Sequence, residues 1–105
     1  MKRIGRMVKI KPEYKDKYIE YHKSVWDSVL RNIKNAGIAN YTIFNYGDLL
    51  FSYYEIDSDN NLDLEKFFTD DASVEWEEIM SPMQENIDGI KGVSWTEMKE
   101  IFHLN

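Results

Sequence analysis

Hydrophobic residues recur with two different spacings along this chain, and the change of spacing separates its predicted elements. Residues 3–10 alternate as a β-strand does, with Ile4, Val8 and Ile10 on one side. Arg6 falls on that same apolar side, where a charged residue is unusual. We therefore expect a strand whose apolar face carries one cation.

A helical spacing takes over between residues 13 and 36. Pro12 suits the first turn of a helix, and Gly37 suits a left-handed cap at its end. These signals predict one continuous helix, on the order of 35 Å long at about 1.5 Å per residue. Its apolar stripe contains one histidine and consists of Tyr14, Tyr18, His22, Val25, Val29, Ile33 and Ala36.

The remaining pattern predicts two strands joined by a tight turn, a polar turn, two helical pieces, a loop and a last strand. We place them, in that order, at residues 40–46 and 49–56, at 57–61, at 62–68 and 73–83, at 84–94 and at 95–104. Gly47 and Asp48 form the turn of the hairpin, and Pro82 marks the end of the second helical piece.

This order of elements, β-α-β-β-α-β, is that of the ferredoxin-like fold of the α+β class. We predict a single domain over residues 1–105, with a four-stranded antiparallel sheet and the helices on one face. Bulky residues occupy both sides of the strands. In the strand at 40–46, for example, Tyr41 and Ile43 lie on one side and Phe44 and Tyr46 on the other. Since the chain offers no further helix to cover the second face, we expect a homodimer, a dimeric α+β barrel with its sheets face to face.

Composition narrows the classes of partner. The net charge of −6 argues against nucleic acid and anionic membranes, which attract basic proteins. Arg6 and Lys9 interrupt any signal-peptide core, no apolar run approaches membrane-spanning length, and cysteine is absent, so we expect a cytoplasmic protein. Two histidines with scattered acids give no metal-ligand signature, and the glycines form no phosphate loop, so we expect neither metal nor cofactor.

His22 is the first candidate for chemistry. It lies one helical turn after Tyr18 on the apolar stripe, and its pKa near neutrality suits proton transfer. The alternative is a buried imidazole that a tyrosine or backbone group satisfies. Tyr41 and Trp76 have flat faces with polar edges that suit a sugar, but their spacing suits core residues equally.

Between positions 12 and 43 the chain contains an ordered set of residues: Pro12, Tyr18, His22, Trp26, Gly37, Asn40-Tyr41 and Ile43. This ordered set resembles the L-rhamnose mutarotases, which are small dimeric ferredoxin-like proteins. The resemblance implies an isomerase that interconverts the α and β anomers of a sugar without a cofactor. It implies His22 as the proton donor, and Tyr18, Tyr41 and Trp76 as sugar-binding residues.

Two departures from the family pattern bear on the sugar. Glu77 stands where the family usually has a second tryptophan, which removes a stacking face and adds an acceptor for a hydroxyl. The loop at residues 85–93 also differs from the family's. L-rhamnose is the default substrate, and L-fucose or another 6-deoxy or pentose sugar is an alternative. Glu77 or a water is a candidate general base, while Arg6 either reaches a hydroxyl or pairs with an acid.

Two other functions fit the same architecture. Dimeric α+β barrels include small monooxygenases that bind haem or aromatic substrates, some through a helix histidine. A dimeric binding module without catalysis, in which His22 is only a core residue, is the second alternative. Because one fold hosts many functions, the element order alone does not separate these three hypotheses.

Overall fold

The computed structural model describes residues 2–56, 70–92 and 94–105. Its helices and strands, including two short 3-10 helices, are β1 (Lys2–Ile10), η1 (Pro12–Tyr14), α1 (Lys15–His22), α2 (Asp27–Asn35), β2 (Ile38–Tyr46), β3 (Leu49–Ile56), α4 (Asp71–Met80), η2 (Ser81–Met83), β4 (Gln84–Glu85) and β5 (Thr96–Met98). The turn predicted at 57–61 and the helical piece predicted at 62–68 lie outside the described residues. No helix in the described ranges is long and apolar enough to cross a membrane.

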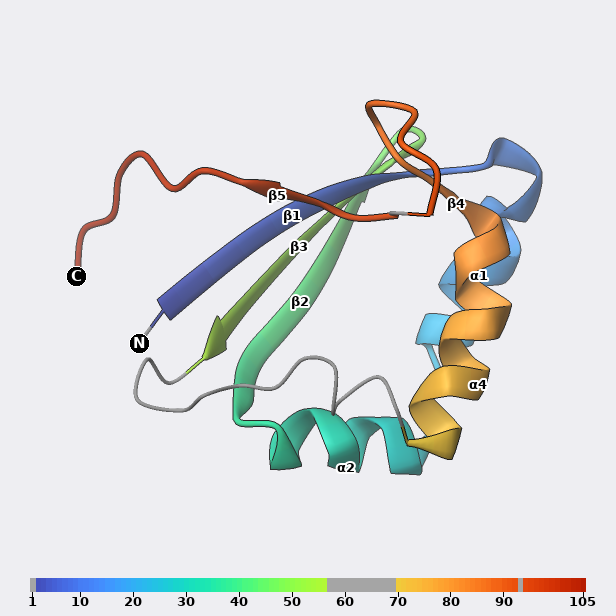
Figure 1. Ribbon diagram of the computed structural model, residues 1–105, viewed down its shortest axis with the longest axis horizontal. Coiled ribbons are helices and arrows are strands. Elements are labelled where there is room, and N and C mark those ends of the chain that lie inside the picture. Colours follow the sequence, from blue (N-terminus) through green and yellow to red (C-terminus); the bar gives the residue numbers. More distant parts are fainter. Residues whose placement is uncertain (1, 57–69, 93) are drawn as a thin grey trace.

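The strands form one curled antiparallel sheet in the order β2-β3-β1-β4 (Figure 1). This order places β3 between β1 and β2, as the ferredoxin-like prediction requires, and the α+β class is confirmed. The β2–β3 hairpin turns at Gly47, whose φ of 57° is left-handed, and Asp48. The structure therefore agrees with the predicted hairpin, although β2 begins two residues earlier than expected.

The last strand is much shorter than the predicted span of 95–104. Only Thr96–Met98 pairs with β1, opposite Gly5–Met7, while β4 pairs with Lys9 and Ile10 further along the same edge. The fourth place in the sheet is thus divided between two short strands. Residues 99–105 have no regular structure and extend away from the body of the molecule (Figure 1). Their apolar positions belong to an extended arm.

The single long helix predicted over residues 13–36 is wrong. The chain forms a 3-10 turn, then α1, and bends at residues 23–26 before α2 begins in another direction (Figure 1). The backbone N–H groups of Lys23 and Ser24 each donate to the carbonyl three residues earlier, which tightens the last turn of α1. Trp26 then has an extended backbone, with ψ at 135°. Since both helices face one core, the apolar spacing continues across the break and conceals it.

The helices pack on the sheet face that carries the even-numbered residues of β1 and β3. Val8 and Leu50 lie opposite each other in register and are almost completely buried. The main core cluster consists of Val8, Ile10, Tyr18, Val29, Leu50, Trp76, Met80 and Met83. It joins α1, α2 and α4 to the sheet, which fixes the helix side chains relative to the strands.

The opposite sheet face, here called the outer face, is also apolar. Met7, Phe51 and Phe44 lie side by side across β1, β3 and β2 in one register. Phe44 is 62% exposed and Tyr46, two residues further on β2, is 79% exposed. None of the described helices packs on this face.

Candidate active site

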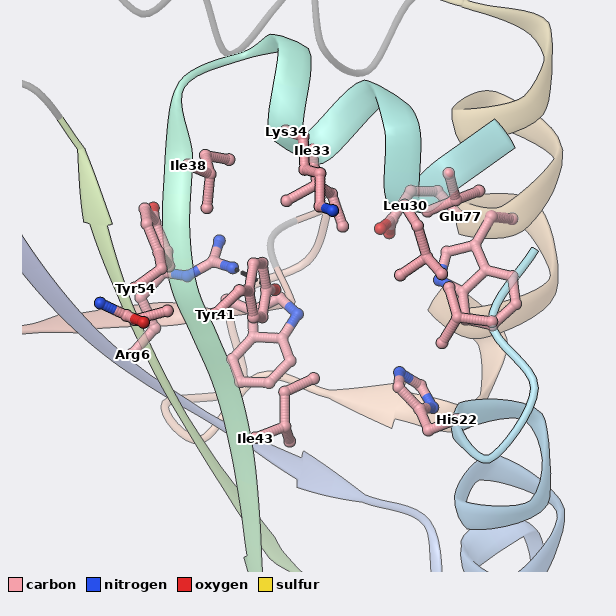
Figure 2. Close-up of a pocket in the computed structure, with 15 residues that line it drawn as sticks. Arg6, His22, Leu30, Ile33, Lys34, Ile38, Tyr41, Ile43, Tyr54 and Glu77 are labelled. Atoms are coloured by element: carbon pink, nitrogen blue, oxygen red, sulfur yellow. Dashed lines mark hydrogen bonds between the residues drawn. The ribbon is translucent and has the colours of Figure 1, made fainter. Parts of the chain in front are cut away.

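A pocket of about 560 Å³ lies between the helices and the inner sheet face. Its volume is within the usual range of small-molecule sites, about 300–1,000 Å³. Aliphatic side chains of α2 and β2 and the rings of Tyr54, Trp76 and Trp95 form much of the wall. The other polar lining residues are Arg6, His22, Lys34, Asn40, Tyr41 and Glu77. His22 and Glu77 project from the helix side, while Arg6 and Tyr41 project from the sheet (Figure 2).

His22 is the last residue of α1, and its ring is held in a defined orientation. Its Nδ1 lies 2.8 Å from the Tyr18 carbonyl oxygen. Because a carbonyl can only accept, Nδ1 carries a proton and donates it, which leaves Nε2 available to the pocket. Burial lowers the pKa of His22, and the bond to the Tyr18 carbonyl opposes that shift. At neutral pH the imidazole is therefore uncharged, and Nε2 can accept a proton.

Tyr18 lies behind His22 rather than in the large pocket. Their rings stack with centroids 4.3 Å apart, and Tyr18 is only 3% exposed. The Tyr18 hydroxyl accepts a hydrogen bond of 3.0 Å from Nε2 of Gln84 in β4, and burial strongly raises its pKa. Both Tyr18 and His22 line a smaller cavity of about 250 Å³. In this arrangement Tyr18 holds the imidazole in place, and its predicted contact with a sugar remains a prediction.

Arg6 enters the pocket from β1. Its guanidinium lies 5.1 Å from the Tyr54 ring centroid and 5.0 Å from that of Trp95. Its Nη2 donates to the Tyr41 hydroxyl at 3.2 Å. None of the ion pairs in the described part of the chain involves Arg6. Arg6 therefore lies in the pocket and pairs with no acid among the described residues. Its contact with a sugar hydroxyl remains a prediction.

Tyr41 reaches the pocket because β2 contains a bulge. The four residues from Ala39 to Thr42 face only three residues of β3, Tyr53 to Glu55, and Asn40 has a positive φ of 53°. The extra residue reverses the alternation, so that Ile38 and Tyr41 both line the pocket. Burial raises the pKa of the Tyr41 hydroxyl, while the neighbouring Arg6 lowers it. The hydroxyl is therefore a neutral group that can donate or accept a hydrogen bond.

Trp76 and Glu77 come from α4, whose first turn is firmly anchored. Asp70 accepts a bond of 2.9 Å from the Ser73 backbone N–H and one of 2.6 Å from the Asn32 side chain of α2. Trp76 then packs edge to face against several rings, at centroid distances of 5.2 Å to Trp26, 5.4 Å to His22 and 6.0 Å to Tyr21. These contacts fix the tryptophan as a wall of the pocket beside His22.

Glu77 is partly buried in the same wall and points toward the interior of the pocket (Figure 2). Burial raises the pKa of its carboxyl group, and the positive charge of Arg6 opposes the shift. The neighbouring acids Glu75 and Glu78 are exposed. Glu77 is thus the one member of this acidic run that lines the pocket.

The structure brings four of the five predicted site residues into the large pocket: His22, Tyr41, Trp76 and Glu77. Tyr54 and Trp95 are pocket residues that sequence reasoning missed. Tyr54 lies an even number of residues after Leu50 on β3, so strand alternation places both on the same sheet face and could have predicted Tyr54. Trp95 lies outside any helix or strand, and no such pattern predicts its position. Within the described residues, no three acidic, histidine or cysteine side chains are placed to hold a metal ion. The pocket thus combines two groups that can exchange protons, His22 and Glu77, with aromatic faces and with side chains that can hydrogen-bond to hydroxyls. This combination suits a small polyhydroxylated molecule.

Comparisons with known proteins identify one family. The family profile of the L-rhamnose mutarotases matches residues 3–104. An L-rhamnose mutarotase of Oceanobacillus iheyensis is 28% identical over 107 residues, which cover both chains fully. A UPF0734 protein of Dictyostelium discoideum is 34% identical over 98 residues, or 86% of this chain and 78% of that protein. The crystal structure of an L-rhamnose mutarotase from Formosa agariphila has a TM-score of 0.79 and 20% identity over both complete chains, which shows a shared fold.

Proposed function

The chain belongs to the L-rhamnose mutarotase family, a family of isomerase-type enzymes, and from this premise we propose that it interconverts the α and β anomers of L-rhamnose or a related 6-deoxy sugar. The family match favours this reaction over the monooxygenase and the binding module. The observation that carries the proposal is the orientation of His22, whose Nδ1–H donates to Tyr18 and leaves Nε2 free beside the pocket. A chain without cysteine suits a reducing compartment, so we place the activity in the cytoplasm.

The reaction needs only proton transfers and a rotation. The anomeric hydroxyl loses its proton while the ring oxygen gains one, and the bond between C1 and the ring oxygen breaks. The resulting aldehyde turns about the C1–C2 bond, and the ring closes on its other face. General acid–base help contributes about 100- to 10,000-fold to such steps. In the proposed site His22 exchanges a proton with the sugar through Nε2.

The pocket offers both kinds of surface that a 6-deoxy sugar requires. Trp76 and Tyr54 present ring faces and edges to C–H groups, while Arg6 and Tyr41 provide hydrogen-bonding groups for hydroxyls. The aliphatic side chains of α2 form an apolar wall suited to the methyl group at C6. The default substrate is L-rhamnose, and L-fucose is the first alternative because both sugars carry this methyl group.

The test is NMR exchange spectroscopy between the α and β anomers of L-rhamnose and L-fucose at catalytic concentrations of protein. The wild type should accelerate exchange of at least one sugar, and His22→Ala should lose about 100-fold or more of that acceleration. His103→Ala is the matched control, because His103 is the other histidine and lies exposed in the C-terminal arm. Exchange no faster than in buffer would contradict the proposal.

The proposal extends to the quaternary state, with a second copy of the chain covering the outer face. The Met7–Phe51–Phe44 row supports this, since an aromatic and aliphatic sheet face calls for a second layer. The arm at residues 99–105 supplies further apolar surface, with Ile101 90% and Phe102 80% exposed. A homodimer with its sheets face to face would bury both features at once.

A further inference from the structure

Two groups that can exchange a proton enter the pocket from different helices. His22 ends α1, Glu77 lies in the middle of α4, and both line the same cavity (Figure 2). Resting on the proposed function, we propose that Glu77 is a second catalytic residue, whose carboxyl group donates a proton to the ring oxygen while Nε2 of His22 takes the proton of the anomeric hydroxyl. This assignment differs from the role that the family resemblance implies for His22, which is donation to the ring oxygen.

The position of Glu77 favours a substrate-facing role. The acids on either side along α4, Glu75 and Glu78, are exposed, whereas Glu77 is partly buried and directed into the pocket. None of the ion pairs among the described residues involves Glu77, so its carboxyl group is not committed to a neighbouring cation. A half-buried acid that forms no ion pair with a described cation, and feels the charge of Arg6 only across the pocket, is a candidate to act on a ligand.

The hydrogen bond of His22 decides which of its nitrogens takes part. Nδ1 donates its proton to the Tyr18 carbonyl, and stacking on Tyr18 prevents the ring from turning. The neutral imidazole therefore presents an unprotonated Nε2, which is a base and not an acid. Ring opening then needs an acid from elsewhere in the pocket, and among the described residues Glu77 is the one carboxyl group that lines it.

Burial of both side chains favours the protonation states that this mechanism needs near neutral pH, with His22 as the base and Glu77 as the acid. It raises the pKa of Glu77 and lowers that of His22, so the two values move toward each other. These shifts reduce the free-energy difference between neutral His22 with protonated Glu77 and the charged alternative, compared with the free side chains. A reaction that runs in both directions between similar anomers benefits from such a balance.

The proton balance of the step is complete. His22 Nε2 takes the proton from the anomeric hydroxyl as its oxygen forms the carbonyl, and the C1 bond to the ring oxygen breaks. Glu77 gives its proton to that ring oxygen, so the open-chain sugar faces an imidazolium and a carboxylate. After rotation about C1–C2, the hydroxyl attacks C1 and returns its proton to Glu77, while His22 returns its proton to the new anomeric oxygen. Both groups end as they began.

Other charged and titratable groups face the same space and shape its response to pH. They are Arg6 of β1, Lys34 of α2, Tyr41 of β2 and Tyr54 of β3. Burial raises the pKa of both tyrosines, so they stay neutral where His22 and Glu77 titrate. Arg6 stabilises the carboxylate that Glu77 forms after donation.

The experiment compares Glu77→Gln with Glu78→Gln in the anomer-exchange assay across pH. The wild type should give a bell-shaped profile, because activity requires one proton on the pair. Glu77→Gln should lower the exchange rate about 100-fold and remove the alkaline limb, whereas Glu78→Gln should match the wild type. A Glu77→Gln variant that keeps wild-type rate while His22→Ala loses it overturns this inference and leaves the proposed mutarotase standing. A wild type inactive on every sugar overturns both.

A readout independent of activity is the titration of His22 followed by nitrogen NMR. The proposal predicts a neutral His22 with its proton on Nδ1. It also predicts that Glu77→Gln lowers the His22 pKa, because a nearby carboxylate favours the imidazolium. Glu78→Gln should leave that pKa unchanged. A His22 titration that both variants leave unchanged would mean that the two groups do not interact, and would overturn the inference.

Discussion

At the scale of single residues, the site depends on side chains that their neighbours hold in one orientation. Tyr18 accepts from the Gln84 side chain and stacks on His22, and His22 in turn donates to the Tyr18 backbone. One buried tyrosine thus fixes both the ring plane and the tautomer of the histidine. Preorganisation of this kind lets a general base act without first being oriented.

The role of Tyr18 can be tested by Tyr18→Phe. The phenyl ring keeps the stacking on His22, but the buried Gln84 Nε2 loses its acceptor, and the free energy of unfolding should fall by about 1–3 kcal/mol. Urea unfolding measures that change, and anomer exchange at saturating sugar should remain near the wild-type rate. Unchanged stability with lost sugar affinity would instead indicate that the hydroxyl contacts the sugar, as the family resemblance implies.

Most of these residues could be identified from the sequence, but their contacts and orientations could not. The Tyr18–His22 spacing of four predicts neighbours on one helix face, and the structure stacks them. The sequence does not contain the tautomer of His22, because it depends on a carbonyl direction set by the end of α1. Glu77 was separated from Glu75 and Glu78 only through the family resemblance, because helical spacing by itself does not show which acid the packing of α4 turns inward.

At the scale of elements, two irregularities place the site. The break between α1 and α2 turns α2 into the pocket wall, and the bulge in β2 directs Tyr41 inward. Helical spacing predicted an unbroken helix, because local pattern does not reveal a bend between helices that share one core. The bulge likewise makes β2 look apolar on both sides, which is partly why bulky residues occur there at both parities.

The bulge should tolerate glycine and reject a β-branched residue at position 40. Asn40 has a φ of 53°, a conformation that costs most L-residues about 1–2 kcal/mol. Asn40→Gly should therefore fold and keep Tyr41 in the pocket, while Asn40→Val should lower both the free energy of unfolding and the affinity for sugar. Thermal unfolding and sugar titration measure these effects, and equal behaviour of the two variants would contradict the account of the bulge.

At the scale of the whole molecule, one chain leaves apolar surface uncovered. The outer face carries the Met7–Phe51–Phe44 row, and the arm at residues 99–105 projects beyond the sheet (Figure 1). The α+β class and strand order followed from the order of elements along the sequence. The arm was not predicted, because its apolar residues have the composition of a strand whereas its backbone pairs with none of the described strands.

The homodimer predicts a solution mass twice the chain mass of 12.5 kDa. Phe44→Asp places a charge in the uncovered aromatic row and should shift the population to monomer, because a dimer would have to bury that charge. Val74→Asp also places a charge at an exposed apolar position, but on helix α4 and away from the outer face, and is the control. Sedimentation equilibrium measures the mass, and a monomeric wild type at micromolar concentration would contradict the proposal.

On the proposed function, this pocket exchanges protons with a sugar at its anomeric centre. The most direct measurement is NMR exchange between the α and β anomers of L-rhamnose, with wild type, His22→Ala and His103→Ala side by side. We expect faster exchange with wild type and His103→Ala, and about a 100-fold smaller acceleration with His22→Ala. Equal acceleration by wild type and His22→Ala would contradict it, because His22 would then be only a buried histidine of the core.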